Sequence, residues 1–422
     1  MQHWEISTSK SGWFTATTGR FLTAELSRIF TVLNDPAGWP VEAPSRLIKT
    51  ETNVVLGYSF ANQSRVELTF DQIRSGLVRV NVVHEHLHNT DELAWAQHYW
   101  QMLLDSLYSR LLCEPVHAAI AFGKINLFFA VGPLQEDGYH QVASLYQSVN
   151  LRETVIAELA PDWQVTTSGS LSAEQLAEVP TDKKNLVVKA AKALAKTGKF
   201  KKAPKLQFWV HKHVPVAGGM GGGSADAAAA MLAAASVWAL ADYQGDLIPA
   251  GSKVGADVPF ALMGGAAIGM GTGHELTGLA QASKLHWVLV PNEFGLSTPL
   301  VFAELDRMRQ AQGRNPSRVA QAKINASLVK ALKAGASAEE IAPLLHNDLQ
   351  AAAVSLRPEL QEILNLADKV FALKAIISGS GPTIAMLARD ANDAIAIASR
   401  LRTYGQQAIV TSSPAGAAQL VL

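Results

Sequence analysis

The chain has 422 residues, of which 48% are hydrophobic and 17% charged, so it is long enough for two or three domains with cores of their own. Its 36 basic residues balance 36 acidic ones, which excludes the overall charge typical of proteins that bind nucleic acids or anionic membranes. No apolar stretch approaches the roughly 20 residues that span a bilayer, and the N-terminus lacks signal-peptide features, so we expect a cytoplasmic protein.

The first predicted elements form an antiparallel sheet followed by a long helix. Ala24–Leu33 has helical spacing, whereas the runs Asn53–Phe60, Arg65–Phe70 and Leu77–Val83 alternate like strands. Asn89 and Glu92 resemble a capping box at the start of a helix. One apolar face of this helix is predicted from helical spacing: Leu93, Trp100, Leu103, Leu107 and Leu111. We therefore expect a helix packed across a curved sheet.

Three histidines alternate just before that helix. In a strand, His84, His86 and His88 would project from one face, a geometry that can bind a metal. No carboxylate of obvious ligand spacing accompanies them. We favour a polar strand face or strand end and predict no metal held by the protein, although the sequence leaves the alternative open.

The composition changes near Cys113, the single cysteine, which excludes an internal disulfide framework and a cysteine-rich zinc site. Five of the nine tryptophans precede it, and glycine and alanine are abundant after it. With its Gly12–Thr18 opening, paired strands and long terminal helix, the first part resembles activator-of-Hsp90-ATPase-like members of the START-related helix-grip superfamily. The resemblance implies a helix-grip domain over residues 1–113, a class that often encloses an apolar cavity, and identifies no ligand.

Ala118–Leu127 predicts an apolar strand that carries Lys124 and Asn126. Buried polar groups need partners, so both residues are candidates for chemistry. The plain alternative is that Lys124 extends to solvent from a strand edge. A turn, Glu136–His140, follows the strand.

A glycine-rich loop then separates a predicted strand, Leu206–Val210, from a predicted helix, Asp226–Ala235, which begins near Ser224. Glycines allow positive φ and close approach to a ligand, and a helix N-terminus attracts anions. The pattern predicts a phosphate-binding loop rather than a flexible linker. It lacks the Walker lysine and the Gly-x-Gly-x-x-Gly spacing of dinucleotide folds. The residues concerned are Gly218, Gly219, Gly221, Gly222, Gly223 and Ser224.

Two later loops contain further candidates. Asp257 lies among small residues, and Pro259 biases Val258 away from helix, so the carboxylate can face a cleft, or else form a turn or cap. Ser378–Thr383 lies between apolar runs, and its glycines and hydroxyls can support the phosphate loop or form a tight strand connection.

Together, Gly123–Leu127, Gly218–Ala229 and Ser378–Thr383 resemble the three motifs of the GHMP small-molecule kinases, in matching order and spacing. The resemblance covers residues 116 to 422. It implies an α+β, two-lobed kinase fold preceded by the helix-grip domain. The first lobe, residues 116–283, would be ribosomal S5 domain 2-like and would bind ATP, and the second, residues 284–422, would be ferredoxin-like.

Further matches at Asp137–His140, Gly255–Phe260 and His346–Leu349 resemble family members that act on a cytidine-diphosphate-linked methylerythritol. This resemblance implies transfer of the ATP γ-phosphoryl group, with Mg²⁺ carried by the nucleotide, to the 2-hydroxyl of that small molecule in non-mevalonate isoprenoid biosynthesis. Asp257 would accept the hydroxyl proton. Lys124 would stabilise the alkoxide and keep Asp257 ionised.

The resemblance also assigns binding residues by position. Asn185 and Lys212 would line the adenine side, next to the glycine loop that holds the phosphates. The cytidine end would comprise Tyr139, His140 and Phe302, through stacking and hydrogen bonding. The substrate's polar groups would meet Asn126 and Thr298. The supporting loop would comprise Ser378, Gly379, Ser380 and Gly381.

Two features depart from the pattern. Ala322–Asn325 repeats the lysine motif, but a predicted helix, Ala326–Ala334, follows it, so we expect Lys323 to be a solvated residue at a helix end. An arginine common in the family shortly before Asp137–His140 is replaced by Gln135 and Glu136.

Two alternative functions remain open. The first is a GHMP kinase of the homoserine or mevalonate type, which Tyr139, His140 and Phe302 disfavour because those substrates offer no base to stack. The second is a non-catalytic nucleotide-binding protein whose N-terminal domain binds an apolar ligand or a chaperone. Lys124, Ser224 and Asp257 argue against that second alternative. The sequence does not predict the oligomeric state.

Overall fold

The computed structural model describes residues 4–8, 13–39, 41, 43–111, 117–197, 200, 202–292 and 294–421. Gly12 and Cys113 lie outside these residues. The chain divides into two compact units, Met1–Val116 with Ala398–Val410, and His117–Ile397 with Thr411–Leu422. The first unit therefore includes Ala398–Val410, a segment within the range predicted for the last lobe. Across the described ranges, every helix is too short or too polar to cross a membrane.

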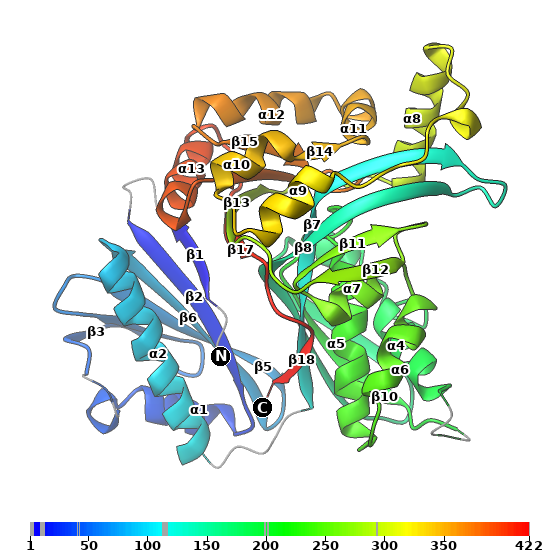
Figure 1. Ribbon diagram of the computed structural model, residues 1–422. Coiled ribbons are helices and arrows are strands. Elements are labelled where there is room, and N and C mark those ends of the chain that lie inside the picture. The colour runs from blue at the N-terminus through cyan, green and yellow to red at the C-terminus, as the bar shows by residue number, and fades with distance from the viewer. Residues whose placement is uncertain are drawn as a thin grey trace. The chain divides into compact units, whose positions relative to one another are not determined.

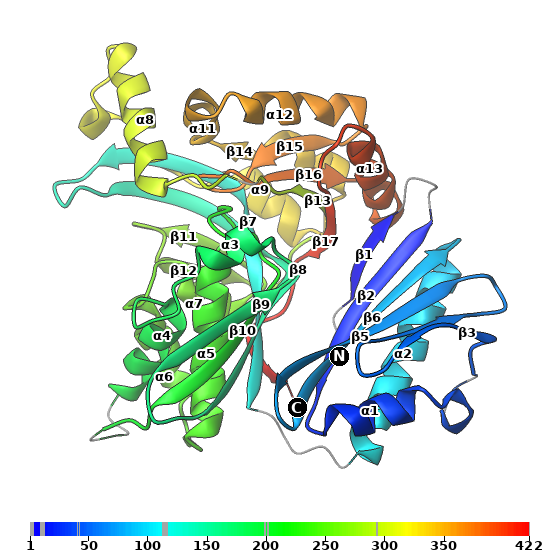
Figure 2. The same cartoon turned by 180° about the vertical axis from the view of Figure 1, so that it is seen from behind.

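The first unit contains an antiparallel sheet in the order β1-β2-β6-β5-β4-β3, with the long helix α2 lying across one face (Figures 1 and 2). The predicted helix and strands are present, with ends shifted by a few residues. The elements are β1 (Glu5–Thr8), β2 (Phe14–Leu22), α1 (Leu26–Leu33), a 3-10 turn (Pro36–Gly38), β3 (Arg46–Glu51), β4 (Val55–Ser59), β5 (Arg65–Arg74), β6 (Leu77–Leu87) and α2 (Thr90–Arg110).

Helix α2 begins where the sequence predicts. The Asn89 side chain accepts hydrogen bonds from the backbone N–H groups of Asp91 and Glu92 and so caps the helix. In a capping box, the Glu92 carboxylate would accept a hydrogen bond from the backbone N–H of Asn89. Here it accepts from the N–H of His88, one residue earlier. The predicted apolar face is buried: Leu93, Trp100, Leu103, Leu107 and Leu111.

The space between this sheet and α2 is packed with aromatic rings. Trp39 contacts Tyr58 and Trp100 edge to face, with ring centroids 5.4 and 5.9 Å apart. A small depression of about 190 Å³ lies beside Phe60 and Trp95. Aromatic rings therefore form part of the core between the sheet and α2.

The three alternating histidines have different surroundings. His84 is fully buried, and its Nδ1 accepts a hydrogen bond from Trp100 Nε1–H at 2.9 Å, so Nε2 carries the hydrogen and donates to Ser64 Oγ. Burial lowers the pKa of His84 to about 3. His86 has a positive φ of 60°, which interrupts the strand alternation, and its ring and that of His88 pack against Trp13. Within the described ranges, no three His, Cys, Asp or Glu residues gather as a metal site.

The second unit begins with a lobe in which helices cover one face of a mixed sheet (Figures 1 and 2). The sheet has the order β12-β11-β8-β10-β9, and β7 pairs with β8, β14 and β18. The elements are β7 (Ala118–Leu134), β8 (His140–Leu159), β9 (Gln164–Gly169), α3 (Ala173–Ala177), α4 (Leu186–Ala195), β10 (Leu206–Lys212), α5 (Gly222–Val237), α6 (Gln244–Ser252), α7 (Val258–Met263), β11 (Ala266–Met270) and β12 (Glu275–Leu279).

The following lobe has a smaller sheet, in the order β15-β16-β13-β17, with α11 and α12 over it (Figures 1 and 2). Helix α8 lies beside the far end of the β7–β8 hairpin in both views. The elements are β13 (Leu285–Val290), α8 (Thr298–Ala311), α9 (Ala326–Lys333), α10 (Ala338–Ile341), β14 (His346–Asn347), α11 (Gln350–Leu356), α12 (Glu359–Lys369), β15 (Lys374–Ile377), β16 (Ile384–Ala388), α13 (Ala391–Thr403), β17 (Ile409–Ser413) and β18 (Gln419–Val421), with 3-10 turns at Pro316–Arg318 and Ala342–Leu344.

Helix α5 forms the centre of the first lobe. All of its side chains from Ala225 to Ala235 are buried, so the helix is apolar on every side apart from Asp226. The small alanine side chains let α5 lie close to both β7–β8 and α4. This packing holds the N-terminus of the helix, and the glycine loop before it, in a fixed position.

Candidate active site

Two adjoining cavities lie between the lobes of the second unit. The first, of about 620 Å³, is lined by Lys124, Asp257 and the aromatic residues from the turn and α8. The second, of about 500 Å³, is lined by the glycine loop and the start of α4. The residues that line both cavities are Gly219, Gly221, Ser224 and Thr298. Two ligands bound in these cavities would therefore meet beside the glycine loop.

The glycine loop leads directly into α5. Gly221 is the N-cap residue with a positive φ of 69°, and no side chain caps the helix, so the first backbone N–H groups remain free for an anion. A Cβ at Gly219 would collide with the carbonyl oxygen of Ser378. Glycine is thus required at this position by contact between two loops, in addition to any ligand.

The Ser378–Thr383 loop, called the late loop below, contacts the glycine loop, as the sequence suggests. Ser378 Oγ donates to the carbonyl oxygen of Gly219 at 3.1 Å, and Ser380 Oγ lies 2.8 Å from Thr298 Oγ1. Asn347, which sequence reasoning left without a role, donates from Nδ2 to the carbonyl oxygens of Ile377 and Gly379 at 2.7 and 2.8 Å. The late loop is therefore held from both sides.

Lys124 projects from β7 toward the boundary of the two cavities. Its Nζ donates to Asn126 Oδ1 and to the carbonyl oxygen of Gly219, both at 2.8 Å, and lies 3.9 Å from Asp257 Oδ2. Burial lowers the pKa of Lys124, and the nearby Asp257 carboxylate partly opposes this effect. The Asp257 side chain is one-third exposed, at 33%, so it can contact both water and a ligand.

The local conformation at Asp257 corrects one sequence inference. Pro259 does not keep Val258 out of a helix, because α7 begins at Val258. Proline is accepted in the first turn of a helix, where its missing N–H would have no intrahelical partner. Asp257 is the N-cap residue, and its side chain makes no capping bond, so its carboxylate faces the first cavity instead.

Asn126 is fully buried, and its amide is engaged within the protein. Its Oδ1 accepts from Lys124, and its Nδ2 donates to Ser144 Oγ at 2.7 Å. Its immediate effect is therefore to orient the ammonium group of Lys124. The ammonium group of Lys124 lies over the ring of Tyr146, with Nζ 5.8 Å from the ring centroid.

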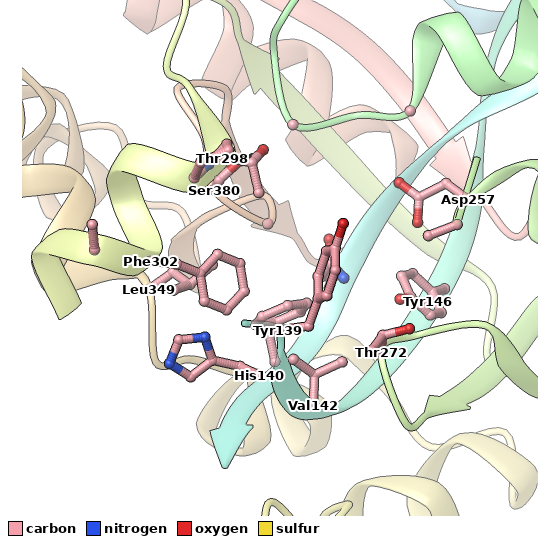
Figure 3. A pocket seen from close by; sticks show the side chains of 18 of the residues that line it. Tyr139, His140, Val142, Tyr146, Asp257, Thr272, Thr298, Phe302, Leu349 and Ser380 are labelled. Carbon is pink, nitrogen blue, oxygen red and sulfur yellow. Dashed lines mark hydrogen bonds between the residues drawn. The ribbon is translucent and has the colours of Figure 1, made fainter. Parts of the chain in front are cut away.

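The aromatic residues lie at the opposite end of the first cavity. Figure 3 shows Phe302 and His140 on one side of the cavity, and Asp257 and Tyr146 on the other. The rings of His140 and Phe302 stack with centroids 5.1 Å apart and planes inclined by 29°. Tyr139 lies between the two groups in this view and is 66% exposed, so its ring is accessible to a ligand.

Asn185 and Lys212, which the sequence assigns to the adenine side, form their hydrogen bonds with other groups of the protein. Asn185 caps α4, because its Oδ1 accepts from the N–H of Val187 at 2.9 Å, and its Nδ2 donates to the carbonyl oxygen of Pro180. Lys212 is 2% exposed, and its ammonium group donates to two carboxylates. Both residues line the second cavity but are held by the protein.

Glu153 and Asp226, which sequence reasoning missed, are the carboxylates that surround Lys212. Lys212 Nζ lies 2.7 Å from Glu153 Oε1 and 2.6 Å from Asp226 Oδ2. Burial alone would lower the pKa of Lys212, but the two carboxylates raise it above its ordinary value. Burial also raises the pKa of Glu153, to about 8, although Lys212 opposes this effect.

The two departures from the family pattern lie at the surface. Lys323 is exposed and precedes Asn325, the N-cap of α9, which confirms that the repeated lysine motif belongs to a helix end. Gln135 and Glu136 are exposed in the turn that leads to Tyr139.

The two-lobed fold and the paired cavities define a small-molecule kinase of the GHMP class. Residues 185–265 match the family model for the GHMP kinases N terminal domain, and residues 328–407 match that for the GHMP kinases C terminal. The chain belongs to the family of 4-diphosphocytidyl-2-C-methyl-D-erythritol kinases, which the following relatives represent.

A 4-diphosphocytidyl-2-C-methyl-D-erythritol kinase of Leifsonia xyli subsp. xyli is 43% identical over 312 residues, which cover 73% of this chain and 99% of that protein. The enzyme of the same name from Clavibacter michiganensis subsp. michiganensis is 42% identical, with 73% and 97% covered. A crystal structure of 4-(cytidine 5'-diphospho)-2C-methyl-D-erythritol kinase superposes with a TM-score of 0.56 at 25% identity, over 71% of this chain and all of that one. L. major mevalonate kinase shares the fold, with a TM-score of 0.53 at 19% identity over 72% and 97% of the two chains.

Proposed function

We infer that this protein transfers the γ-phosphoryl group of ATP to the 2-hydroxyl of 4-diphosphocytidyl-2-C-methyl-D-erythritol, giving the 2-phosphate and ADP. The observation that carries this inference is the position of the Lys124–Asp257 pair, with the glycine loop on one side and the aromatic residues on the other. Family membership over 73% of the chain supports the same reaction.

The second cavity has the features that a nucleoside triphosphate requires. The uncapped N-terminus of α5 offers backbone N–H groups and a positive dipole end to the phosphates. The Ser224 hydroxyl lines both cavities and is a hard oxygen donor of the kind that Mg²⁺ prefers. A Mg²⁺ ion carried by the nucleotide would offset the phosphate charge. Asn185 and Lys212 would fix the walls of this cavity.

The first cavity supplies the groups that act on the alcohol. Asp257 accepts the proton of the 2-hydroxyl as that oxygen bonds to the γ-phosphorus and the bond from phosphorus to the leaving ADP oxygen breaks. Lys124, which Asn126 and the Gly219 carbonyl orient, stabilises the negative charge on the attacking oxygen. Both groups belong to rigid elements, β7 and the start of α7, which favours a fixed reaction geometry.

The aromatic end favours a cytidyl substrate over homoserine or mevalonate. Tyr139 and Phe302 offer ring faces on which a base can stack, and His140 can hydrogen-bond its edge. Thr298, which lines both cavities, would contact the substrate's polar groups near the transferred phosphoryl group. A small alcohol without a base would leave this end of the cavity unused.

We further propose that the first unit is a START-related helix-grip domain, and that the two kinase lobes are ribosomal S5 domain 2-like and ferredoxin-like. The sheet order β1-β2-β6-β5-β4-β3 and the long helix α2 support the first assignment.

A single experiment tests the proposed reaction. ATP consumption is measured with the cytidyl substrate, homoserine and mevalonate, for the full chain and for a chain that begins near residue 113. We expect the cytidyl substrate to be preferred by both, since the predicted catalytic residues all follow residue 116. Faster phosphorylation of homoserine or mevalonate would contradict the proposed substrate, and loss of turnover on shortening would show that the kinase depends on the first unit.

A further inference from the structure

The base-binding end of the first cavity contains a carboxylate that no motif predicted. Asp306 lies on α8 one turn after Phe302, and its Oδ1 is 3.0 Å from Nε2 of His140. The side chains of His140 and Asp306 are largely buried, at 6% and 16% exposure, and both residues line the cavity. Helical spacing thus places the stacking ring and the carboxylate on the same face of α8.

We propose that Asp306 is a positioning residue that sets the hydrogen-bonding character of His140, and so makes the cavity select cytosine over uracil. The proposal rests on the inferred function, because it concerns the base of the cytidyl substrate. It assigns a role in base selection to a residue remote from the phosphoryl transfer.

His140 and Asp306 form a hydrogen-bonded pair of imidazole and carboxylate. A carboxylate only accepts hydrogen bonds, so Nε2 of His140 must carry a hydrogen and donate it to Asp306. In the neutral imidazole, Nδ1 is then an acceptor. With Nε2 bound to Asp306, Nδ1 is the remaining ring nitrogen, and it can accept a hydrogen bond from a donor.

The orientation of the imidazole is fixed at three points. His140 is held in the β7–β8 hairpin, where it pairs with Leu134. One ring face stacks on Phe302, and Nε2 is bound to Asp306. Among the described residues, no further hydrogen bond of the ring is found, so Nδ1 is the ring nitrogen without a partner in the protein, and His140 lines the cavity.

The two pyrimidines differ at the position that such an acceptor can read. Cytosine has an exocyclic amino group, which donates, whereas uracil has a carbonyl oxygen there, which accepts. The cytosine amino group can donate a hydrogen bond to Nδ1. With uracil, Nδ1 would face the carbonyl oxygen, which is also an acceptor, and no hydrogen bond would form. An unpaired or opposed polar group in a buried site weakens binding strongly, and the geometry therefore favours cytosine.

The decisive variant is Asp306→Asn. Asparagine is nearly isosteric, but its amide N–H can donate to Nε2, which lets the hydrogen of the ring move to Nδ1 and turns Nδ1 into a donor suited to uracil. We expect the ratio of kcat/KM for the cytidine over the uridine diphosphate substrate to fall roughly tenfold or more. The change should lie mainly in KM, because Lys124 and Asp257 are untouched.

The matched control is Glu304→Gln on the same helix. Glu304 pairs with Arg307 and Ser355, outside the cavity, so the base preference should equal that of the unaltered enzyme. A base preference in Asp306→Asn that also equals that of the unaltered enzyme would overturn the proposal. Absence of activity on the cytidyl substrate in the unaltered enzyme would instead refute the proposed function.

A second measurement reads the tautomer without any variant of Asp306. Nitrogen NMR of the unaltered protein, with the His140 signals identified from their loss in His140→Gln, distinguishes the two ring nitrogens. We expect the hydrogen on Nε2. A hydrogen on Nδ1, with or without one on Nε2, would make Nδ1 a donor and contradict the proposal whatever the kinetic result. This measurement is decisive even where Asp306→Asn fails to fold.

Discussion

Two buried lysines line the two cavities, Lys124 the first and Lys212 the second, and their surroundings differ. Lys124 donates to two neutral oxygens, and its nearest carboxylate, that of Asp257, is 3.9 Å away and one-third exposed. Lys212 lies between two buried carboxylates at 2.7 and 2.6 Å. Burial lowers the pKa of Lys124, whereas the carboxylates raise that of Lys212. Neutral partners leave the charge of Lys124 available to a ligand, and ionic partners use that of Lys212 within the protein.

This difference supports the proposed catalytic role of Lys124 and indicates a structural role for Lys212. The Lys212 cluster joins β8 to β10 and α5, the two elements that flank the glycine loop, so it supports the wall of the second cavity. A buried ion pair adds little net stability, but removal of one partner leaves an uncompensated charge. The two lysines should therefore respond to the same substitution in different ways.

The largest expected effect is the loss of stability in Lys212→Met. Removal of the ammonium group leaves Glu153 and Asp226 buried without a cation, which should lower the free energy of unfolding by about 3–5 kcal/mol. Lys124→Met should cost less stability, because Asp257 can be solvated, and should abolish most turnover. Denaturant unfolding and initial rates of both variants test the distinction. Equal losses of stability would show that the two lysines have the same role.

The next effect concerns turnover alone. Asp257→Asn keeps the size of the side chain and removes its ability to accept a proton, so we expect kcat to fall at least about 10²-fold. ATP binding, measured by calorimetry, should be largely retained, because the nucleotide cavity is formed by other residues. Unchanged turnover would exclude Asp257 as the base.

Much of the fold follows from local sequence. The alternating runs before residue 90, the Asn89 cap and the alanine-rich helix each formed as predicted, because their periodicity and capping chemistry act within a few residues. The prediction that Pro259 keeps Val258 out of a helix was wrong, because proline is accepted in the first turn, where α7 begins. The prediction that the three histidines alternate along a strand was wrong at His86, which has a positive φ. No residue type in that segment predicts this conformation.

The site was predictable only where a motif contains it. Lys124, Asp257 and the glycine loop could be identified from sequence, and the structure brings them together. Asp306 and Glu153 could not, since each contacts a partner more than thirty residues away. Asn347 lies in the His346–Leu349 match, but its bond to the Ser378–Thr383 loop was not predicted. Spacing along α8 offered one usable signal, because Asp306 follows Phe302 by a single turn.

The last prediction concerns the pH dependence of the Lys212 cluster. Burial, with the charge of Asp226, raises the pKa of Glu153 from 4.5 to about 8 in the folded protein. A carboxyl whose pKa is raised on folding contributes stability at low pH, which is lost as the pH rises from about 4.5 to about 8. Glu153→Gln cannot ionise, so its free energy of unfolding should change less over this range than that of the unaltered protein. Thermal unfolding at a series of pH values tests this, with Glu158→Gln on the same strand as the control. An identical pH profile in Glu153→Gln would mean that Lys212 keeps Glu153 ionised throughout, and the cluster would then be a plain ion pair.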